Sequence, residues 1–310
     1  MTAAPLYAEV AQGPADGRAV WLTSGPEQIR AAVWNPGAIK GTVFLLPGRT
    51  EYVEKYGQAA GELARYGYAT LSVDWRGQGM ATRALPDRMA GHVADFAEYQ
   101  ADLDALIAFA VAQGLPRPWY MLAHSMGGCI GLRGLMRGLD FKAAAFSAPM
   151  WGILISAWMR PVASLLATAS RIMGFETKYA PGTGPSTYVV DFPFAGNSLT
   201  TDPEMWEYMR RQALAHPDLS LGGPSYAWVR AALIECQALA LMPSPATPAV
   251  CGLGLQERIV DVVPIHARMA RWPNGRLDLY PGSEHEVMME RPAIRSAFLR
   301  RAAELFDANR

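Results

Sequence analysis

The fold of this chain is decided by the stretch Trp119-Tyr120-Met121-Leu122-Ala123-His124-Ser125-Met126-Gly127-Gly128. It reads as an apolar strand that runs into a serine and then into a glycine-rich helix. A serine at a sharp strand-to-helix turn needs small residues two positions before and after it, because strand and helix pass closely there. Gly127 meets this requirement and Ala123 exceeds it by one methyl group. The stretch therefore predicts a nucleophile elbow with Ser125 at its tip.

Strands and helices alternate on both sides of this elbow. An opening hairpin is expected over 20–23 and 29–34. Short apolar runs predict further strands at 40–46, 68–75, 143–147, 248–254 and 276–280. Helical spacing of apolar residues predicts helices at 56–66, 96–112, 126–139, 264–271 and 292–305. Such alternation predicts an α/β fold, with a mostly parallel sheet covered by helices on both faces.

The alternation stops after Pro149 and resumes near Ala249. The residues between are rich in tryptophan and methionine and contain proline-glycine breaks, without strand patterns. We interpret 150–240 as a helical cap, or lid, inserted into one core made of 1–149 and 241–310. An ordinary second helical domain with its own core remains the alternative, since aromatic residues and methionines at helical spacing usually pack inside a protein.

No part of the sequence predicts a membrane span or a secretory signal. The apolar segment 143–169 is interrupted by Pro149, Arg160 and Pro161, whereas a spanning helix needs about 20 mostly uninterrupted apolar residues. Residues 1–20 lack a basic start followed by an apolar core. The three cysteines lie in apolar contexts without metal-ligand spacing, which indicates free thiols in a reducing compartment. A cytoplasmic location is expected.

Composition excludes several classes of partner. Twenty-eight Lys and Arg residues balance twenty-eight Asp and Glu residues, so no bulk charge attracts nucleic acid or an anionic membrane. The turn at 77–79 lacks the third glycine and the helix of a dinucleotide-binding fingerprint. We expect no cofactor, no metal and no nucleic-acid partner.

A serine nucleophile needs a histidine base, which follows the serine and an acid along the chain in this type of fold. His285 lies in a loop of small residues after the last predicted strand, where such a base belongs. His92 comes too early and is expected to make a structural hydrogen bond. His124 must point away from Ser125. The last two histidines, His216 and His266, fall in the predicted cap and in a helix.

The acid is expected after the preceding strand, where Glu257 and Asp261 are the two candidates. Glu257 comes first and lies nearer the carboxyl edge of the sheet. Asp261 is better placed to cap the next helix, because aspartate accepts hydrogen bonds from the free N–H groups at a helix start. We favour Glu257 on position alone, since either carboxylate can orient an imidazole.

Two backbone N–H groups are expected to form an oxyanion hole. Met126 follows the nucleophile, and Arg49 lies in the loop after the strand that ends at Leu46. The Arg49 guanidinium has two interpretations. It pairs with an anionic head group, such as a phosphate, at the mouth of the site, or with Glu51 or Glu54 on the surface.

Five motifs in order resemble the monoacylglycerol lipase and bacterial lysophospholipase branch of the α/β-hydrolases. They are Leu46-Pro47-Gly48-Arg49-Thr50-Glu51-Tyr52, Asp74-Trp75-Arg76-Gly77-Gln78-Gly79, Gly91-His92-Val93, Ala123-His124-Ser125-Met126-Gly127-Gly128 and Gly282-Ser283-Glu284-His285-Glu286. The resemblance spans nearly the whole chain. It implies an α/β-hydrolase fold with Ser125 as nucleophile, His285 as base and an acid at the Glu257 position.

The chain departs from the family pattern in two places. The family more often has aspartate at the acid and His-Gly where this chain has Pro47-Gly48. Glutamate is chemically able to replace aspartate, and a backbone N–H donor is unaffected by proline at position 47.

These observations predict a serine ester hydrolase that works through an acyl-enzyme. The apolar residues 151–173 suit an acyl chain, so monoacylglycerol or lysophospholipid is the expected substrate, with transient contact between the cap and a membrane surface. A carboxylesterase acting on short or xenobiotic esters is the alternative. A non-catalytic binding protein of the same fold is the third possibility.

Overall fold

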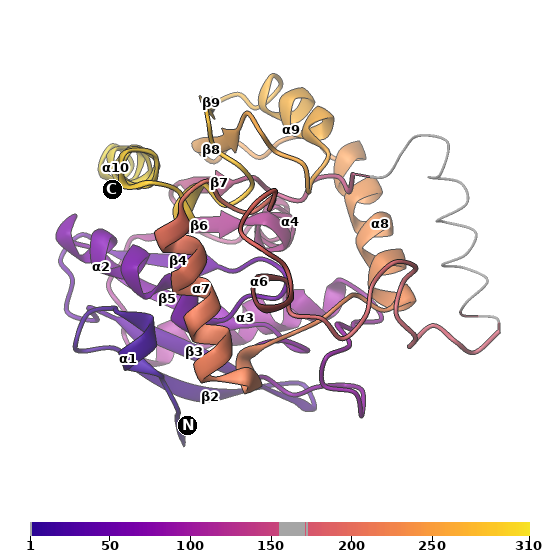
Figure 1. Ribbon diagram of the computed structural model, residues 1–310. Helices are drawn as coiled ribbons and strands as arrows, with labels where there is room; N and C mark the ends of the chain where they lie inside the picture. The colour runs from indigo at the N-terminus through magenta and orange to yellow at the C-terminus, as the bar shows by residue number, and fades with distance from the viewer. Residues whose placement is uncertain (1, 155–170, 172) are drawn as a thin grey trace.

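The computed structural model describes residues 2–154, 171 and 173–310. The described residues form a nine-stranded sheet in the order β1-β2-β3-β5-β4-β6-β7-β8-β9 (Figure 1). Its strands are β1 (Thr2–Ala4), β2 (Arg18–Ser24), β3 (Glu27–Trp34), β4 (Thr42–Leu46), β5 (Ala69–Asp74), β6 (Trp119–His124), β7 (Ala144–Ser147), β8 (Ala249–Gly254) and β9 (Gly275–Tyr280). Strands β1 to β3 pair antiparallel, and β3 pairs antiparallel with β5. The other neighbours are parallel, which confirms a mostly parallel sheet.

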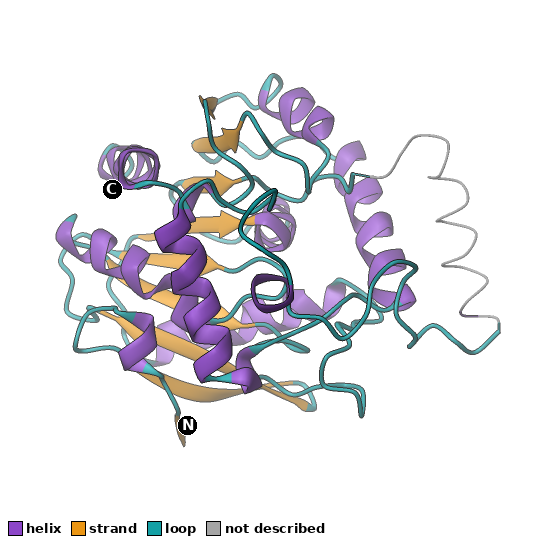
Figure 2. Cartoon of the chain, in the orientation of Figure 1, coloured by secondary structure: helices purple, strands orange, loops and turns teal. Residues whose placement is uncertain are grey.

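Helices cover both faces of this sheet, as the alternation of elements predicts (Figure 2). On one face lie α2 (Gly57–Arg65) and α10 (Pro292–Asp307), whose side chains share one buried cluster. On the other face lie α3 (Ala97–Ala112), α4 (Ser125–Met136) and α9 (Val262–Met269). Every residue of β4 to β8 is buried, because helices shield both faces of these strands.

The strand order reverses at β4, which lies between β5 and β6. Thr42 of β4 pairs with Ala69 on one side and with Trp119 on the other, both in parallel register. The connection after β4 leads to β5, whereas the connection after β5 returns across β4 to β6. Crevices form where successive connections leave a sheet in opposite directions. The loop after β4, which carries Arg49, and the direct turn from β6 into α4, where Ser125 lies, meet at this point.

Between β7 and β8 the described elements are helices. They are α6 (Tyr188–Asp191), α7 (Pro203–Ala215), the 3₁₀ turn η2 (Pro217–Leu219) and α8 (Tyr226–Leu241). The last helix packs Trp228 and Cys236 into the same cluster as α3 and α4, whereas α7 places Tyr208 and Met209 in the cluster of α2 and α10. The described helices of 150–240 therefore share their apolar contacts with the sheet domain. The division at residues 149 and 241 stays a prediction.

Several features lie outside the expected elements. The short β1 and α1 (Ala8–Ala11) precede the hairpin, and 3₁₀ turns occur at η1 (Val53–Tyr56) and η3 (Val287–Met289). Of the apolar segment 143–169, residues 155–169 lie outside the described residues. Within the described part, no helix combines the length and apolar character that crossing a membrane requires. The three cysteines are buried free thiols, as expected.

Candidate active site

The predicted nucleophile elbow has the expected shape. Strand β6 ends at His124 and α4 begins at Ser125, whose φ is +48°. A non-glycine residue seldom adopts this left-handed conformation, and such strain concentrates at functional sites. A Cβ atom on Gly127 would lie 2.1 Å from the Leu46 carbonyl oxygen, so glycine is required there. Ala123, in contrast, fits within β6 and is fully buried.

His285 is paired with Glu257 and not with Asp261. The imidazole Nδ1 lies 2.6 Å from Glu257 Oε2, and both side chains are buried. Glu257 Oε1 also accepts hydrogen bonds from the backbone N–H groups of Ile259 and Val260, at 2.6 and 3.1 Å. Asp261 caps α9 by accepting a hydrogen bond from the Val263 N–H. The structure thus gives both candidate acids the partners that their positions in the turn predict.

Glu257 is ionised in this setting. Burial raises the pKa of the carboxyl group, but the charge and hydrogen bond of His285 and the two backbone donors outweigh it, so the pKa lies below its ordinary value. An ionised Glu257 accepts the Nδ1–H of His285 and leaves the imidazole Nε2 for another partner. The His285 ring also contacts the ring of His124, the residue before Ser125, with 4.7 Å between ring centroids.

The loop after β4 is shaped by hydrogen bonds to Glu51. The Gly48 N–H donates to the Glu51 carboxylate and is therefore not available to a substrate oxyanion. The Arg49 N–H is the next backbone donor along the loop. Thr50 has a φ of +66°, which turns the chain sharply after Arg49. Met126 is the second residue of α4, and its N–H has no acceptor within the helix. The assignment of Arg49 and Met126 to an oxyanion hole stays a prediction.

A buried cluster of charged side chains beside Ser125 and His285 joins three segments of the chain. Lys55 Nζ lies 2.5 Å from Glu51 Oε1 and 2.6 Å from Glu286 Oε1. The Nδ1 of His124 faces the Ser147 carbonyl oxygen at 3.0 Å and donates to it, since a carbonyl oxygen only accepts. The His124 Nε2 faces Glu286 at 3.4 Å and Glu51 at 3.6 Å. These contacts connect the loop after β4, the elbow and the loop that carries His285.

The charges of this cluster stabilise one another. Burial lowers the pKa of both Lys55 and His124, but Glu286 and Glu51 raise each pKa above its ordinary value. Burial raises the pKa of Glu286, yet Lys55 and His124 hold it well below its usual range. Glu51, His124 and Glu286 also have the spacing of three metal ligands. The Lys55 ammonium already bridges both carboxylates, so we assign no metal to this position.

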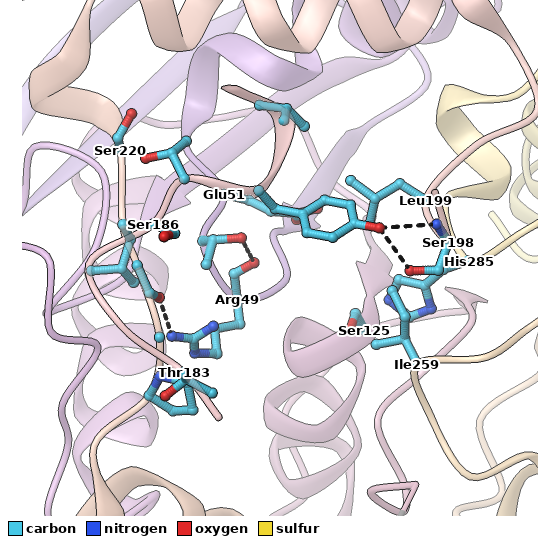
Figure 3. A pocket seen from close by; sticks show the side chains of 18 of the residues that line it. Arg49, Glu51, Ser125, Thr183, Ser186, Ser198, Leu199, Ser220, Ile259 and His285 are labelled. Carbon is cyan, nitrogen blue, oxygen red and sulfur yellow. Dashed lines mark hydrogen bonds between the residues drawn. The ribbon is translucent and has the colours of Figure 1, made fainter. Parts of the chain in front are cut away.

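Ser125 and His285 line one cavity of about 530 Å³ (Figure 3). Its wall is largely apolar and is made of residues from the sheet loops and from 150–240. The apolar lining consists of Tyr52, Met150, Ile153, Tyr188, Val189, Phe192, Leu199, Met209, Ala213, Leu221, Pro224, Trp228, Ile259 and Val260. Of the expected lining, 151–173, Ile153 lines the cavity, whereas Trp151 packs in the core against Trp272. Residues 155–170 and 172 of the expected lining lie outside the described residues.

The surface interpretation of Arg49 is wrong. Glu51 is occupied by Lys55, and Glu54 is paired with Arg30 at 2.6 Å. The Arg49 guanidinium lies in the wall of the cavity and donates a hydrogen bond to the Gly222 carbonyl oxygen. Acidic residues two and five positions away are plausible partners in the sequence. In the folded chain, however, Glu51 faces Lys55 and Glu54 faces Arg30.

Three of the remaining histidines take structural positions. His92 Nδ1 lies 2.9 Å from the Ser225 hydroxyl, as expected for a structural hydrogen bond. His216 pairs with Glu9 and stacks on Tyr7, and His266 lies in α9. Sequence reasoning missed the role of Lys55 and Glu286 beside the site. The four-residue spacing of Glu51 and Lys55 was a usable signal for their pair, whereas nothing in the sequence indicated that Glu286 joins it.

A comparison with protein families identifies the chain. The family model described as serine aminopeptidase, S33, matches residues 37–292, which is more than half of the chain. The chain belongs to the S33 family. Lysophospholipase L2 of Escherichia coli is 34% identical to this S33 member over 278 residues, which cover 86% of this chain and 80% of the relative. This match confirms the resemblance that the five sequence motifs indicate.

Solved structures confirm the α/β-hydrolase fold of this S33 member. A soluble variant of monoglyceride lipase from Saccharomyces cerevisiae superposes with a TM-score of 0.72 at 17% identity, covering 94% of both chains. A carboxyl esterase from Bacillus coagulans superposes with a TM-score of 0.76 at 15% identity, covering 94% of this chain and 98% of the other. At these identities the likeness concerns the fold.

Proposed function

We propose that this protein is a serine hydrolase that cleaves the carboxylic ester of single-chain lipids, monoacylglycerol or lysophospholipid. The observation that carries the proposal is that Ser125, at the tip of a strained elbow, shares an apolar cavity with the buried His285–Glu257 pair. The E. coli relative is named a lysophospholipase, and it aligns with most of this chain.

The proposed reaction proceeds through an acyl-enzyme. The Ser125 Oγ attacks the ester carbonyl carbon while His285 Nε2 takes its proton, and the backbone N–H groups of Arg49 and Met126 stabilise the oxyanion. His285 then protonates the leaving glycerol oxygen, and the C–O bond breaks. Water, deprotonated by His285, releases the fatty acid and restores Ser125. Glu257 holds the imidazole and stabilises its positive charge during both steps.

The apolar wall of the cavity favours a lipid over a small polar ester. A cavity of this size and lining removes an acyl chain from water, which is favourable in proportion to the apolar area buried. Leu154, Met173 and Phe192, which are 55%, 63% and 51% exposed, provide apolar surface on the 150–240 segment. They support transient contact of this segment with a lipid surface. The proposal includes a cytoplasmic location of the protein.

The test is hydrolysis of p-nitrophenyl esters with two to sixteen carbons, followed by hydrolysis of monoacylglycerol and lysophosphatidylcholine. We expect kcat/KM to rise with chain length and Ser125→Ala to abolish it, with a loss of about 10⁴-fold or more. Activity confined to the shortest esters would instead support a carboxylesterase. Equal activity of the wild type and Ser125→Ala would contradict the serine mechanism, and binding without turnover would indicate a non-catalytic member of the fold.

A further inference from the structure

The Arg49 guanidinium is held in place at the wall of the cavity by contacts with backbone and an aromatic ring. One of its terminal nitrogens, Nη2, donates to the Gly222 carbonyl oxygen, and the Trp228 ring lies 5.2 Å from the guanidinium carbon. Gly91 lies close to the guanidinium, since a Cβ atom on Gly91 would come within 2.7 Å of the same nitrogen. Backbone on two sides and an aromatic ring therefore fix the position of this cation.

Within the described part of the chain, the Arg49 guanidinium has no acidic partner. Among the described residues no carboxylate lies within ion-pair distance of Arg49, and residues 155–170 and 172 contain neither Asp nor Glu. Its Nε is buried and lacks a hydrogen-bond partner within the described part of the chain. Burial lowers the pKa of Arg49 to about 10, so the group stays charged at neutral pH. Partial burial of a cation without an ion-pair partner costs free energy, and a bound anion offsets this cost.

The remaining charges along the cavity are already paired. Lys55 lies between Glu51 and Glu286, so these carboxylates and this ammonium neutralise one another to a large extent. Around Arg49 the wall carries hydroxyl groups instead, on Thr183, Ser186 and Ser220 (Figure 3). In this view Ser125 and His285 lie across the cavity from Arg49. One side of the cavity thus presents the proposed catalytic pair, and the other presents a cation with the hydroxyl groups of Ser186 and Ser220, whereas the Thr183 hydroxyl donates to the Ala180 carbonyl oxygen at 2.7 Å.

We propose that the Arg49 guanidinium binds the phosphate of the head group and thereby favours lysophospholipid over monoacylglycerol. This inference rests on the proposed function. In a lysophospholipid the glycerol backbone separates the reacting ester from an anionic phosphodiester, so the two groups need recognition at two separate places. A guanidinium donates parallel hydrogen bonds to two phosphate oxygens, which a neutral glycerol hydroxyl cannot reproduce. Arg49 is therefore a specificity-determining residue.

The test measures binding without turnover. Ser125→Ala and the double variant Ser125→Ala/Arg49→Met are titrated calorimetrically with an ether-linked lysophosphocholine and with the alkylglycerol of the same chain length. Both ligands are kept below their critical micelle concentrations. We expect the double variant to bind the phosphate ligand about 10- to 100-fold more weakly, because charge-assisted hydrogen bonds are lost. Affinity for the alkylglycerol should change by less than about threefold.

Two further variants separate the guanidinium from the loop that carries it. Gly91→Ala places a methyl group against the Arg49 Nη2 and leaves residue 49 unchanged. Because the methyl group displaces the guanidinium, the variant should lower the affinity for the phosphate ligand and leave the affinity for the alkylglycerol unchanged. Arg65→Met removes an arginine on α2 that is 74% exposed and outside the cavity, and should affect neither ligand. Thermal melting curves of all variants show whether each one folds.

The result that would overturn the inference is an equal change, or no change, in affinity for the two ligands when Arg49 is replaced. Hydrolysis assays with enzyme that retains Ser125 then distinguish the proposed function from the proposed role of Arg49. If lysophosphatidylcholine is hydrolysed but Arg49→Met does not lower its kcat/KM relative to monoacylglycerol, the proposed function stands and the role of Arg49 fails. If neither lipid is hydrolysed, the proposed function fails, while the calorimetric comparison still decides whether Arg49 binds phosphate.

Discussion

At the scale of single residues, Glu257 and Asp261 lie four positions apart in sequence but have different roles, one beside His285 and one at the start of α9. Both are carboxylates in the turn after β8, and either is chemically able to orient an imidazole. Glu257 reaches His285, whereas Asp261 satisfies a free N–H at the start of α9. The choice depends on which carboxylate faces the loop after β9, a loop that is distant in sequence.

Glu257→Gln should lower kcat/KM by about 10²- to 10⁴-fold, because a neutral amide cannot stabilise the imidazolium and does not enforce the required tautomer. Asp261→Asn is the matched control, since asparagine caps a helix about as well as aspartate. It should leave kcat/KM within about threefold of the wild type. Ester hydrolysis by both variants measures this difference. A larger loss for Asp261→Asn than for Glu257→Gln would contradict the pairing.

At the scale of elements, the elbow depends on how closely α4 passes the loop after β4. Gly127 lies in the first turn of α4, and a Cβ atom there would meet the carbonyl oxygens of Leu46 and Pro47 at 2.1 and 2.5 Å. Backbone cannot move aside as a flexible side chain does. The glycine therefore allows α4, which carries Met126, to pass close to the loop after β4, which carries Arg49.

Gly127→Ala should lower the free energy of unfolding by about 1–3 kcal/mol or more, because an added methyl group overpacks this contact. It should also lower kcat, since the elbow and the loop after β4 move apart. Gly61→Ala in α2 is a matched helical glycine whose Cβ atom would meet its nearest neighbour at 3.9 Å. It should raise stability by about 0.5–1 kcal/mol. Urea denaturation measures both changes, and similar stabilities of the two variants would refute this explanation.

At the scale of the whole molecule, buried charges connect the antiparallel strands to the parallel part of the sheet. Arg30 of β3 lies 2.6 Å from Glu54 of η1 and 2.8 Å from Asp74 of β5, and all three side chains are fully buried. Asp74 also accepts the Val53 N–H, which holds η1 against the end of β5. This network fixes η1, the element that follows the loop carrying Arg49 and Glu51.

Arg30→Met should lower the free energy of unfolding by about 3–5 kcal/mol, because it leaves two carboxylates buried without their cation. Arg210→Met provides the control. Arg210 pairs with Glu207 at 3.4 Å on the surface, where the two side chains are 40% and 46% exposed. Loss of an exposed pair should cost about 0–1 kcal/mol. Equal losses in denaturant titrations would show that the buried network contributes little to stability.

The sequence by itself determined the alternation of strands and helices, the position of the elbow and the placement of His285 after the last strand. These features depend on local periodicity, on the steric requirements of a tight turn and on the order of elements along the chain, all of which neighbouring residues encode. The edge strand β1 and the short α1 escaped prediction, because segments of three and four residues carry too little periodicity.

Only the tertiary structure decided the partners of the charged residues. It paired Glu257 with His285, Lys55 with Glu51 and Glu286, and Glu54 with Arg30. It left Arg49 facing the cavity without an acidic partner among the residues that the structure describes. Glu51 and Glu54 lie near Arg49 in the sequence, yet the turn at Thr50 and the 3₁₀ turn η1 direct them elsewhere. The strength of an ion pair depends on distance and burial, and for these residues both are set by segments far apart in the chain.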